Sequence, residues 1–344
     1  MGFRPFGGAS RNADLGALHE VFFIAAVTTI LCIRTELWLT HYPQLGGHGL
    51  HIAHLLWGGL LMTIAIAILL TLLGRRARWP AALIGGVGFA FFIDELGKFI
   101  TADNDYFFKP AAGLIYLVFV TIFLLSRAYR HHRGLSEAER LRNAIELLGE
   151  AAVGPFRRSS RDRAMALLAG VAAENGLRAP LLALVEGVEA EPDPSPPWYE
   201  RAADGLGARY RAWSEQRWFH RFVLAVFAVW AVLGLVAVLG LVLGFDGDSV
   251  DHLSFVNCAS LVTIAVSTVL VAVGLARLLE GRRLDAYAWI VRALLVSIFV
   301  TRVFSFVESQ FGAIFGLGVD VLLLISVQLM ARQERRRDDV GGSR

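Results

Sequence analysis

The sequence predicts an all-α, polytopic membrane protein: eight transmembrane helices in two parallel four-helix repeats, with a small helical cytoplasmic insert. Three observations support this fold class. Hydrophobic residues make up 56% of the 344 residues and charged residues only 18%, whereas soluble domains average about 45–50% and about 25%. Several apolar stretches are long enough to cross a bilayer. Arginines gather in alternate connecting segments, as they do in membrane proteins.

The composition also excludes several classes of protein. The net charge is only +3 and the basic residues are split among separate runs, so the chain carries no nucleic-acid footprint. The only two cysteines, Cys32 and Cys258, exclude a disulfide framework, and we expect both to be buried and inert. Gly85–Gly88 lies inside a span with no preceding strand, so it predicts close helix packing and not a nucleotide loop, as does Gly312–Gly316.

Eight apolar stretches approach or exceed the roughly 20 residues that a membrane-spanning helix needs. The first is too long for a signal peptide and has no small-residue cleavage pattern. The predicted spans are 20–40, 52–73, 80–100, 111–127, 219–244, 253–277, 286–308 and 312–331. The predicted domains are therefore a first membrane repeat (1–127), an insert (128–218), a second membrane repeat (219–331) and a basic tail (332–344).

The loops predict a multi-pass plasma-membrane protein with both termini in the cytoplasm. Segments 41–51 and 245–252 contain no Lys or Arg, and 101–110 contains only Lys109. Cytoplasmic loops carry the excess of basic residues, so the arginine-bearing segments are assigned to the inner side. These arginines are Arg4, Arg11, Arg75, Arg76, Arg78, Arg127, Arg130, Arg133, Arg282, Arg283, Arg332, Arg335, Arg336 and Arg337.

An internal duplication is predicted from an offset of 207 residues between the halves. Gly74-Arg75-Arg76 then matches Gly281-Arg282-Arg283, and Phe92 matches Phe299. Both halves begin on the same side, so the repeats would be parallel, about an axis along the membrane normal. Chance alignment of apolar helices is the alternative.

The insert is polar and predicts short helices. Ser136 and Glu139 form a capping box, and Glu191–Pro197 is typical of a stiff, extended linker. Segment 198–217 mixes tryptophan and tyrosine with arginine, which predicts an amphipathic helix on the anionic inner leaflet of the bilayer. Packing of that helix on its own domain is the alternative. Nothing in the insert indicates catalysis, so we expect it to mediate contacts, with a protein partner as one option.

Ionisable residues in the outer half of the spans predict a polar site between spans 1, 2, 3 and 7. Asp94 and Lys98 lie four residues apart and can pair on one helix face. The 207-residue offset sets Glu95 opposite Arg302. Charges inside a membrane usually face a protein interior or an aqueous cavity, although a purely structural ion network is equally open. The candidate site residues are Glu36, Asp94, Glu95, Lys98, Arg302, Glu308 and Asp320.

Histidines form a second candidate site. His48, His51 and His54 recur every third residue at the start of span 2. Together with Asp94 or Glu95 they could bind a divalent metal such as zinc or iron. Hydrogen-bonded or proton-relaying histidines, and haem ligation, are the alternatives, and the cofactor is otherwise unknown.

Three functions fit these residues. The first is a transporter or ion-coupled membrane protein with an outward-opening polar site. The second is a membrane metal enzyme that acts on a lipid or envelope substrate. The third is a structural or scaffold subunit whose charges fix the bundle. Flux that depends on substrate would indicate the first, and stoichiometric bound metal would favour the second. Neither substrate nor oligomeric state follows from the sequence.

Overall fold

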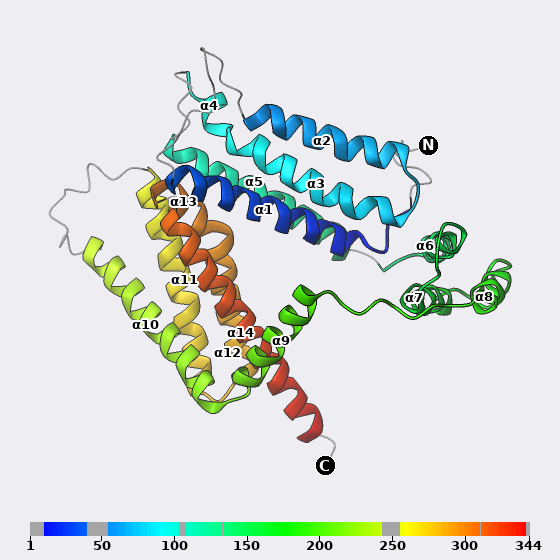
Figure 1. Ribbon diagram of the computed structural model, residues 1–344. Helices are drawn as coiled ribbons and strands as arrows, with labels where there is room; N and C mark the ends of the chain where they lie inside the picture. Colours follow the sequence, from blue (N-terminus) through cyan, green and yellow to red (C-terminus); the bar gives the residue numbers. More distant parts are fainter. Residues whose placement is uncertain are drawn as a thin grey trace, which may run out of the picture. The chain divides into compact units, whose positions relative to one another are not determined.

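The computed structural model describes residues 10–39, 54–102, 108–131, 134–242, 255–309 and 311–341 (Figure 1). Every regular element in these ranges is a helix, which confirms the predicted all-α class. The chain divides into two compact units. Unit 1 comprises residues 1–106 and 121–195, and unit 2 comprises residues 107–120 and 196–344.

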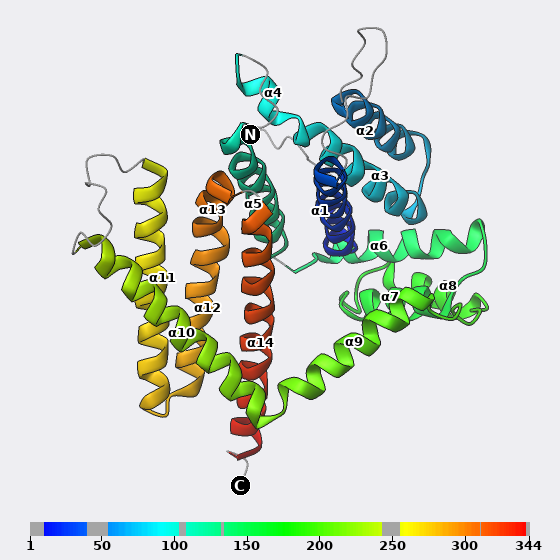
Figure 2. The ribbon, with the colours of Figure 1, turned by 60° about the vertical axis from the view of Figure 1, so that its left-hand side comes forward.

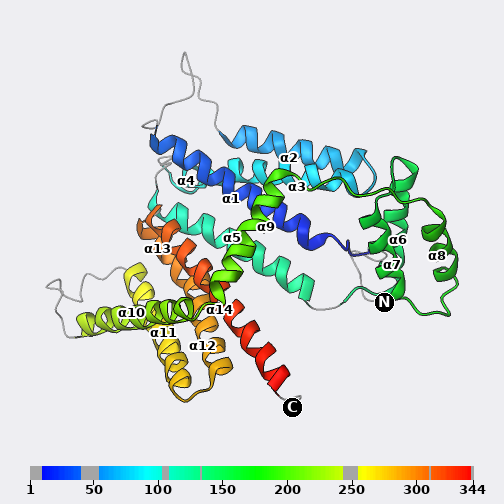
Figure 3. The ribbon, with the colours of Figure 1, turned by 60° about the horizontal axis from the view of Figure 1, so that its bottom comes forward.

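Unit 1 contains three long helices that run side by side: α1 (Leu15–Leu39), α2 (His54–Thr71) and α3 (Arg75–Asp94) (Figures 1 and 3). Helix α3 packs against both α1 and α2. Glycines make this approach close, because a Cβ atom on Gly58 of α2 would lie 2.7 Å from the carbonyl oxygen of Gly88 in α3. Gly86 lies against Phe22 and Ala25 of α1. The glycines of span 3 therefore serve helix packing, as predicted.

Helix α3 breaks near its end. It stops at Asp94, and the short helix α4 (Leu96–Ile100) follows Glu95, whose φ and ψ are −82° and 6°. The backbone N–H of Lys98 donates to the carbonyl oxygen of Glu95 at 3.0 Å. The predicted span 80–100 is thus two helices with Glu95 between them.

Helix α5 (Lys109–His131) contributes its first half to unit 2 and its second half to unit 1. In unit 1, the ring of Phe123 meets that of Phe23 edge-on at 6.0 Å, and Ser126 hydrogen-bonds His19. This second half of α5 therefore packs on α1.

The insert adds α6 (Glu137–Gly149), the 3₁₀ turn η1 (Glu150–Ala152), α7 (Arg158–Ala169) and α8 (Arg178–Gly187) to unit 1. These helices share an apolar core of their own that includes Leu147, Leu168 and Val185. The capping box is confirmed, since the Ser136 hydroxyl accepts from the backbone N–H of Glu139 and the Glu139 carboxylate accepts from that of Ser136.

The Pro-rich linker folds back on the insert where it begins. The Glu191 N–H donates to the Phe156 carbonyl at 2.8 Å, and the Arg158 N–H donates to the Glu191 carbonyl at 3.0 Å. The Asp193 carboxylate accepts from the backbone N–H of Ser159 at 3.0 Å and from its hydroxyl. Asp193 thus caps the first turn of α7 from a distant part of the chain. The first residues of the linker are part of the insert.

Unit 2 contains α9 (Trp198–Ser214), α10 (Arg217–Val242), α11 (Phe255–Leu279), α12 (Arg283–Val296), the π-helical turn η3 (Ser297–Thr301), α13 (Arg302–Ser309) and α14 (Phe311–Gly341) (Figure 2). Its apolar core joins α10, α11, α12 and α14 through side chains that include Phe227, Ile290, Leu294 and Met330. Helix α9 packs on α14 and α10.

Seven helices are long and apolar enough to cross a membrane, which indicates a multi-pass membrane protein. They are Leu15–Glu36, His54–Thr71, Pro110–Tyr129, Trp218–Val236, Cys258–Leu279, Arg283–Ser309 and Gly312–Arg335. Helix α3 is not among the seven: it carries Arg75, Arg76 and Arg78 at one end and Asp94 at the other. The eighth span stays a prediction.

The expectation that both cysteines are buried is wrong, because Cys32 and Cys258 are exposed on α1 and α11. Many large apolar side chains are exposed as well, including Leu70 and Val269. Apolar side chains on a membrane helix can face lipid, so they need not be buried in a protein core. An apolar stretch in this sequence therefore does not predict burial.

The two halves share local features at the predicted offset. Gly74 and Gly281 are the glycines with positive φ in the described ranges, at 94° and 79°. The break after Asp94 corresponds to the start of α13 at Arg302. The packing differs, because α3 contacts α1 and α2 whereas α12 contacts α11 and α14. The duplication therefore stays a prediction.

Close packing of α2 on α3 predicts opposite effects at adjacent glycines. Gly58→Ala should lower the melting temperature in detergent, because its Cβ would meet backbone atoms of Phe92 and Gly88 at 2.6 and 2.7 Å. Such overpacking costs about 1–3 kcal/mol. Gly59→Ala is the matched control, since nothing lies within 4 Å of its Cβ, and it should leave stability equal or slightly higher. Equal melting temperatures for the two variants would contradict this packing.

Candidate functional site

Two acids at the end of α3 are fully buried. Asp94 and Glu95 are both 0% exposed. Asp94 accepts a hydrogen bond from Nε of Arg34 in α1 at 2.6 Å, and its backbone carbonyl accepts a second bond from Arg34 Nη2 at 3.1 Å. Removing a charge from water is costly unless a partner of opposite sign compensates, so Arg34 fixes α1 against the end of α3.

Glu95 lies between the end of α3 and the start of α4, and its side chain faces α2. Its Oε1 accepts from the backbone N–H of His54, the first residue of α2, at 2.8 Å. The positive end of the α2 dipole therefore meets a carboxylate. Lys98 places its Nζ 3.0 Å from Glu95 Oε2. Among the described residues, no donor points at Oε2 with hydrogen-bond geometry, so within them this oxygen has a nearby charge and no hydrogen bond.

The ion pair of Lys98 differs from the predicted one. The sequence assigned Lys98 to Asp94, four residues earlier, whereas the structure pairs it with Glu95, three residues earlier. Residues three apart and residues four apart both lie on one helix face, so the sequence spacing allowed either acid as the partner of Lys98. The structure places the ammonium beside Glu95, at the junction of α3 and α4.

Of the three predicted metal-binding histidines, the structure describes His54 alone. His48 and His51 lie outside the described residues. His54 Nδ1 is 3.7 Å from Glu95 Oε1, which is an ion-pair distance only if the imidazole is protonated. Within the described ranges, no three His, Cys, Asp or Glu side chains are grouped so that they could hold a metal ion. The metal site stays a prediction.

Unit 2 contains a second buried acid. Asp320 of α14 is 2% exposed. Its Oδ2 accepts from the Ser297 hydroxyl at 2.8 Å and from Arg302 Nε at 2.7 Å. Gly316 lies one turn before Asp320 on the same face of α14, where a Cβ atom would collide with the Arg302 guanidinium. The absence of a side chain there lets Arg302 reach Asp320.

The π-helical turn of unit 2 has a partner on α5. The wider turn over Ser297–Thr301 disturbs the regular backbone ladder, and π turns of this kind are frequent at functional sites. The hydroxyl of Tyr116 donates to the Ile298 carbonyl at 2.5 Å, and its ring stacks on Phe306 at 4.6 Å. The buried hydroxyl of Thr301 has no hydrogen-bond partner.

The predicted site residues thus fall into two groups. Asp94, Glu95 and Lys98 lie together in unit 1, and Arg302 and Asp320 lie together in unit 2. Glu36 and Glu308 are exposed on α1 and α13. A single cavity that joins both groups, with Glu95 near Arg302, stays a prediction.

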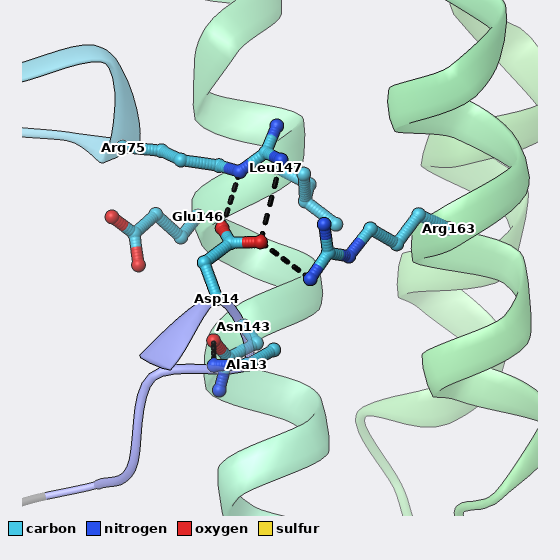
Figure 4. A pocket seen from close by; sticks show the side chains of 7 residues that line it. All are labelled: Ala13, Asp14, Arg75, Asn143, Glu146, Leu147 and Arg163. Carbon is cyan, nitrogen blue, oxygen red and sulfur yellow. Dashed lines mark hydrogen bonds and ion pairs between the residues drawn. The ribbon is translucent and has the colours of Figure 1, made fainter. Parts of the chain in front are cut away.

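A third set of charges lies at the opposite end of α3, and sequence reasoning missed it as a site (Figure 4). Asp14 is 6% exposed, accepts a hydrogen bond from Arg75 of α3 and forms an ion pair with Arg163 of α7 at 2.5 Å. Arg75 also lies 3.6 Å from Glu150, which accepts from the Ser160 hydroxyl at 2.9 Å. In the sequence, Arg75 serves only as an orientation signal and Arg163 belongs to no motif, and no sequence pattern gives their long-range partners.

The segment before α1 holds the insert in place beside this network. The Ala13 N–H donates to Asn143 Oδ1, and Asn143 Nδ2 donates to the Arg11 carbonyl, both at 2.8 Å (Figure 4). Arg11 donates to the Glu139 carboxylate from Nε and Nη2 at 2.9 Å each. These hydrogen bonds lower the pKa of Glu139 from 4.5 to about 2. The insert is thus bound to the membrane helices of unit 1 by hydrogen bonds and ion pairs.

Comparisons with protein-family models, with curated proteins and with solved structures found no match to this chain. The interpretation of the site therefore depends on its own chemistry.

The Arg302–Asp320 contact predicts different effects at two glycines of α14. Gly316→Ala should destabilise unit 2, because its Cβ would lie 2.1 Å from Arg302 Nη1 and the guanidinium must shift beside Asp320. The guanidinium ends a flexible side chain, so the loss should be smaller than the roughly 3 kcal/mol that complete removal of a buried partner costs. Gly318→Ala is the control, since nothing lies within 4 Å of its Cβ. Thermal unfolding in detergent measures both. Equal stability would show that the guanidinium does not depend on the space at Gly316.

The Arg11–Glu139 pair predicts an acid-sensitive insert. Because the pKa of Glu139 is lowered to about 2 from 4.5, its stabilisation is complete above pH 4.5 and is lost as the pH falls toward 2. The melting temperature of Glu139→Gln should be below wild type at pH 6, and the difference should shrink between pH 4.5 and pH 2. Glu174→Gln, an exposed change on the same insert, should show no such trend. A difference that is independent of pH would contradict the assignment.

Proposed function

We propose that the protein is an ion-coupled membrane transporter whose cation site includes Glu95, on the outer side of a plasma membrane. One observation carries this proposal: a fully buried carboxylate lies at a helix break, and among the described residues one of its oxygens is met by the Lys98 ammonium alone, without a hydrogen bond. Ionisable residues within membrane helices mark ion and proton pathways. Transporters also build their sites at discontinuous helices, where free backbone groups and helix ends meet the ion.

We propose that the Lys98 ammonium competes with the transported or coupling cation for the Glu95 carboxylate. Its Nζ is next to Glu95 Oε2, and its side chain is 23% exposed, so the ammonium can leave without unfolding the helix. A cation or proton that replaced it would keep Glu95 neutralised. The hydrogen bond from His54 to Oε1 would hold the carboxylate in place during the exchange.

Asp94 has a different proposed role. Its carboxylate is hydrogen-bonded to Arg34, which connects α1 to α3 and leaves Glu95 as the acid that exchanges partners. Arg302 and Asp320 are proposed to face the same outward-opening site between spans 1, 2, 3 and 7, as members of the second repeat. Both termini and the insert would be cytoplasmic, in agreement with the arginine-rich loops.

The proposed partner of α9 is the anionic inner leaflet. Trp198, Leu206 and Trp213 are 74%, 71% and 55% exposed, although all three are large and apolar. The opposite edge of α9 is held by α14, where Gln333 donates to the Ser214 hydroxyl at 3.3 Å. Arginines flank the apolar stripe, as in helices that bind anionic bilayers.

A structural subunit is the second candidate, because Asp94 and Asp320 are both paired with arginines as in a network that only fixes helix register. A metal enzyme remains a further proposal, for which His48, His51 and His54 would supply ligands. Elemental analysis of the purified protein tests the metal directly.

The test is ion flux in proteoliposomes. Purified protein is reconstituted, and H⁺, Na⁺ and K⁺ gradients are imposed in turn while the internal concentration of each ion is followed. We expect flux of at least one cation. Glu95→Gln should reduce it at least tenfold, because the amide keeps the shape of the side chain and removes its charge. Glu20→Gln, an exposed glutamate on α1 of the same unit, is the control and should retain the flux.

Two results would contradict the proposal. One is flux that is equal in wild type and Glu95→Gln. The other is the absence of cation flux in wild type together with a lowered melting temperature in Glu95→Gln, which would favour the structural subunit.

A further inference from the structure

Arg292 is an arginine inside an apolar membrane helix. It lies nine residues after Arg283, the start of the Arg283–Ser309 candidate span. At about 1.5 Å per residue, that is about 13 Å along the helix. Its side chain is exposed, on the surface of unit 2 and not in its core. An arginine on such a surface needs an anion or water within reach of its guanidinium.

Arg292 differs from the other arginines of α11–α13 in its partners. Each of the other four pairs with a carboxylate: Arg277 with Glu280, Arg282 with Asp285, Arg283 with Glu334 and Arg302 with Asp320. Among the described residues, no carboxylate pairs with Arg292, which distinguishes it from the other arginines of these three helices. Its guanidinium carbon lies over the ring of Trp289, 4.6 Å from the ring centroid. The charge is stacked and not neutralised.

Helix geometry shows which way this arginine reaches. Long side chains on a helix lean toward its N-terminus, which for α12 is the end at the Gly281–Arg283 turn. Trp289 lies one turn nearer that end, and tryptophan is enriched at the depth of the lipid headgroups. Arginines below the membrane surface extend toward the headgroups in the same way. The guanidinium of Arg292, which lies over Trp289, therefore leans toward the headgroup layer at that end of the helix.

We infer that Arg292 and Trp289 form a binding site for the phosphate of an anionic phospholipid in the leaflet at the Gly281–Arg283 turn. A guanidinium can give two parallel N–H bonds to one phosphate, and stacking on an indole holds it flat while its N–H edge stays free. The positive charge accounts for the anion, and the apolar surface of α12 accounts for the acyl chains. We commit to a lipid and not to an acid of a partner helix, because the exposed guanidinium leans toward the headgroups and is stacked on a tryptophan, the residue enriched at that depth.

The experiment is lipid binding by the full-length protein. Detergent-purified protein is titrated with dioleoylphosphatidylglycerol, with dioleoylphosphatidylcholine as the zwitterionic comparison, and bound lipid is counted by native mass spectrometry. We expect a phosphatidylglycerol that binds at least tenfold more tightly than phosphatidylcholine. Arg292→Ala should weaken it about tenfold, and Trp289→Leu about threefold. Arg277→Ala removes one paired charge from α11, and it should leave the affinity unchanged.

Several results would overturn the inference. Equal phosphatidylglycerol affinity for wild type and Arg292→Ala would show that no lipid phosphate binds this guanidinium. Displacement of the bound lipid by millimolar inorganic phosphate would show a general anion site. Dissociation of an oligomer in Arg292→Ala, without loss of lipid, would assign the arginine to an acid of a neighbouring subunit. If Arg292→Ala is not recovered folded, Arg292→Lys gives the same comparison, with loss of the two-bond geometry and retention of charge. Unchanged lipid affinity in Arg292→Lys would rule out the two-bond geometry.

Discussion

The cost of placing charge in an apolar medium constrains the whole structure. Asp94, Glu95 and Asp320 are buried within or beside membrane helices, so each must meet a cation or an aligned backbone group. Arg34 meets Asp94 across α1 and α3, and Arg302 meets Asp320 across α13 and α14. The requirement for neutralisation therefore fixes the register of helices that have little hydrophobic force to hold them together in lipid.

Two of these contacts lie at breaks in the helices. Asp94 and Glu95 flank the interruption between α3 and α4, where Asp94 accepts from Arg34 and Glu95 meets the start of α2 and Lys98. In unit 2, Arg302 follows the π turn, and the missing side chain at Gly316 leaves space for its guanidinium beside Asp320. Glycines allow close contacts because they have no side chain. A side chain at Gly58 would overlap a neighbouring backbone, and one at Gly316 would overlap the Arg302 guanidinium.

Helix α3 connects two polar sites of different character. Its Arg75 end is held by Asp14 and the insert, and its other end carries Asp94 and Glu95, about 28 Å away at about 1.5 Å per residue. This separation is close to the thickness of a bilayer core, about 30 Å. Both ends carry ion pairs, Asp14 with Arg75 and Arg163 at one end and Glu95 with Lys98 at the other. Among the described residues, Glu95 Oε2 has this ion pair and no hydrogen bond, which is the basis for the proposal that cations exchange at Glu95.

By itself, the sequence determined the features that depend on neighbours in the chain. Apolar length predicted the long helices, Ser136 and Glu139 predicted a cap, and the glycines of span 3 predicted close packing. Only the tertiary structure decided which charges meet. Lys98 pairs with Glu95 although Asp94 lies on the same face, Asp14 joins Arg75 to Arg163 across three separate segments, and Asp193 folds back to cap α7. Such pairings depend on how distant segments pack, and the energy that selects them is a sum over contacts that no local spacing encodes.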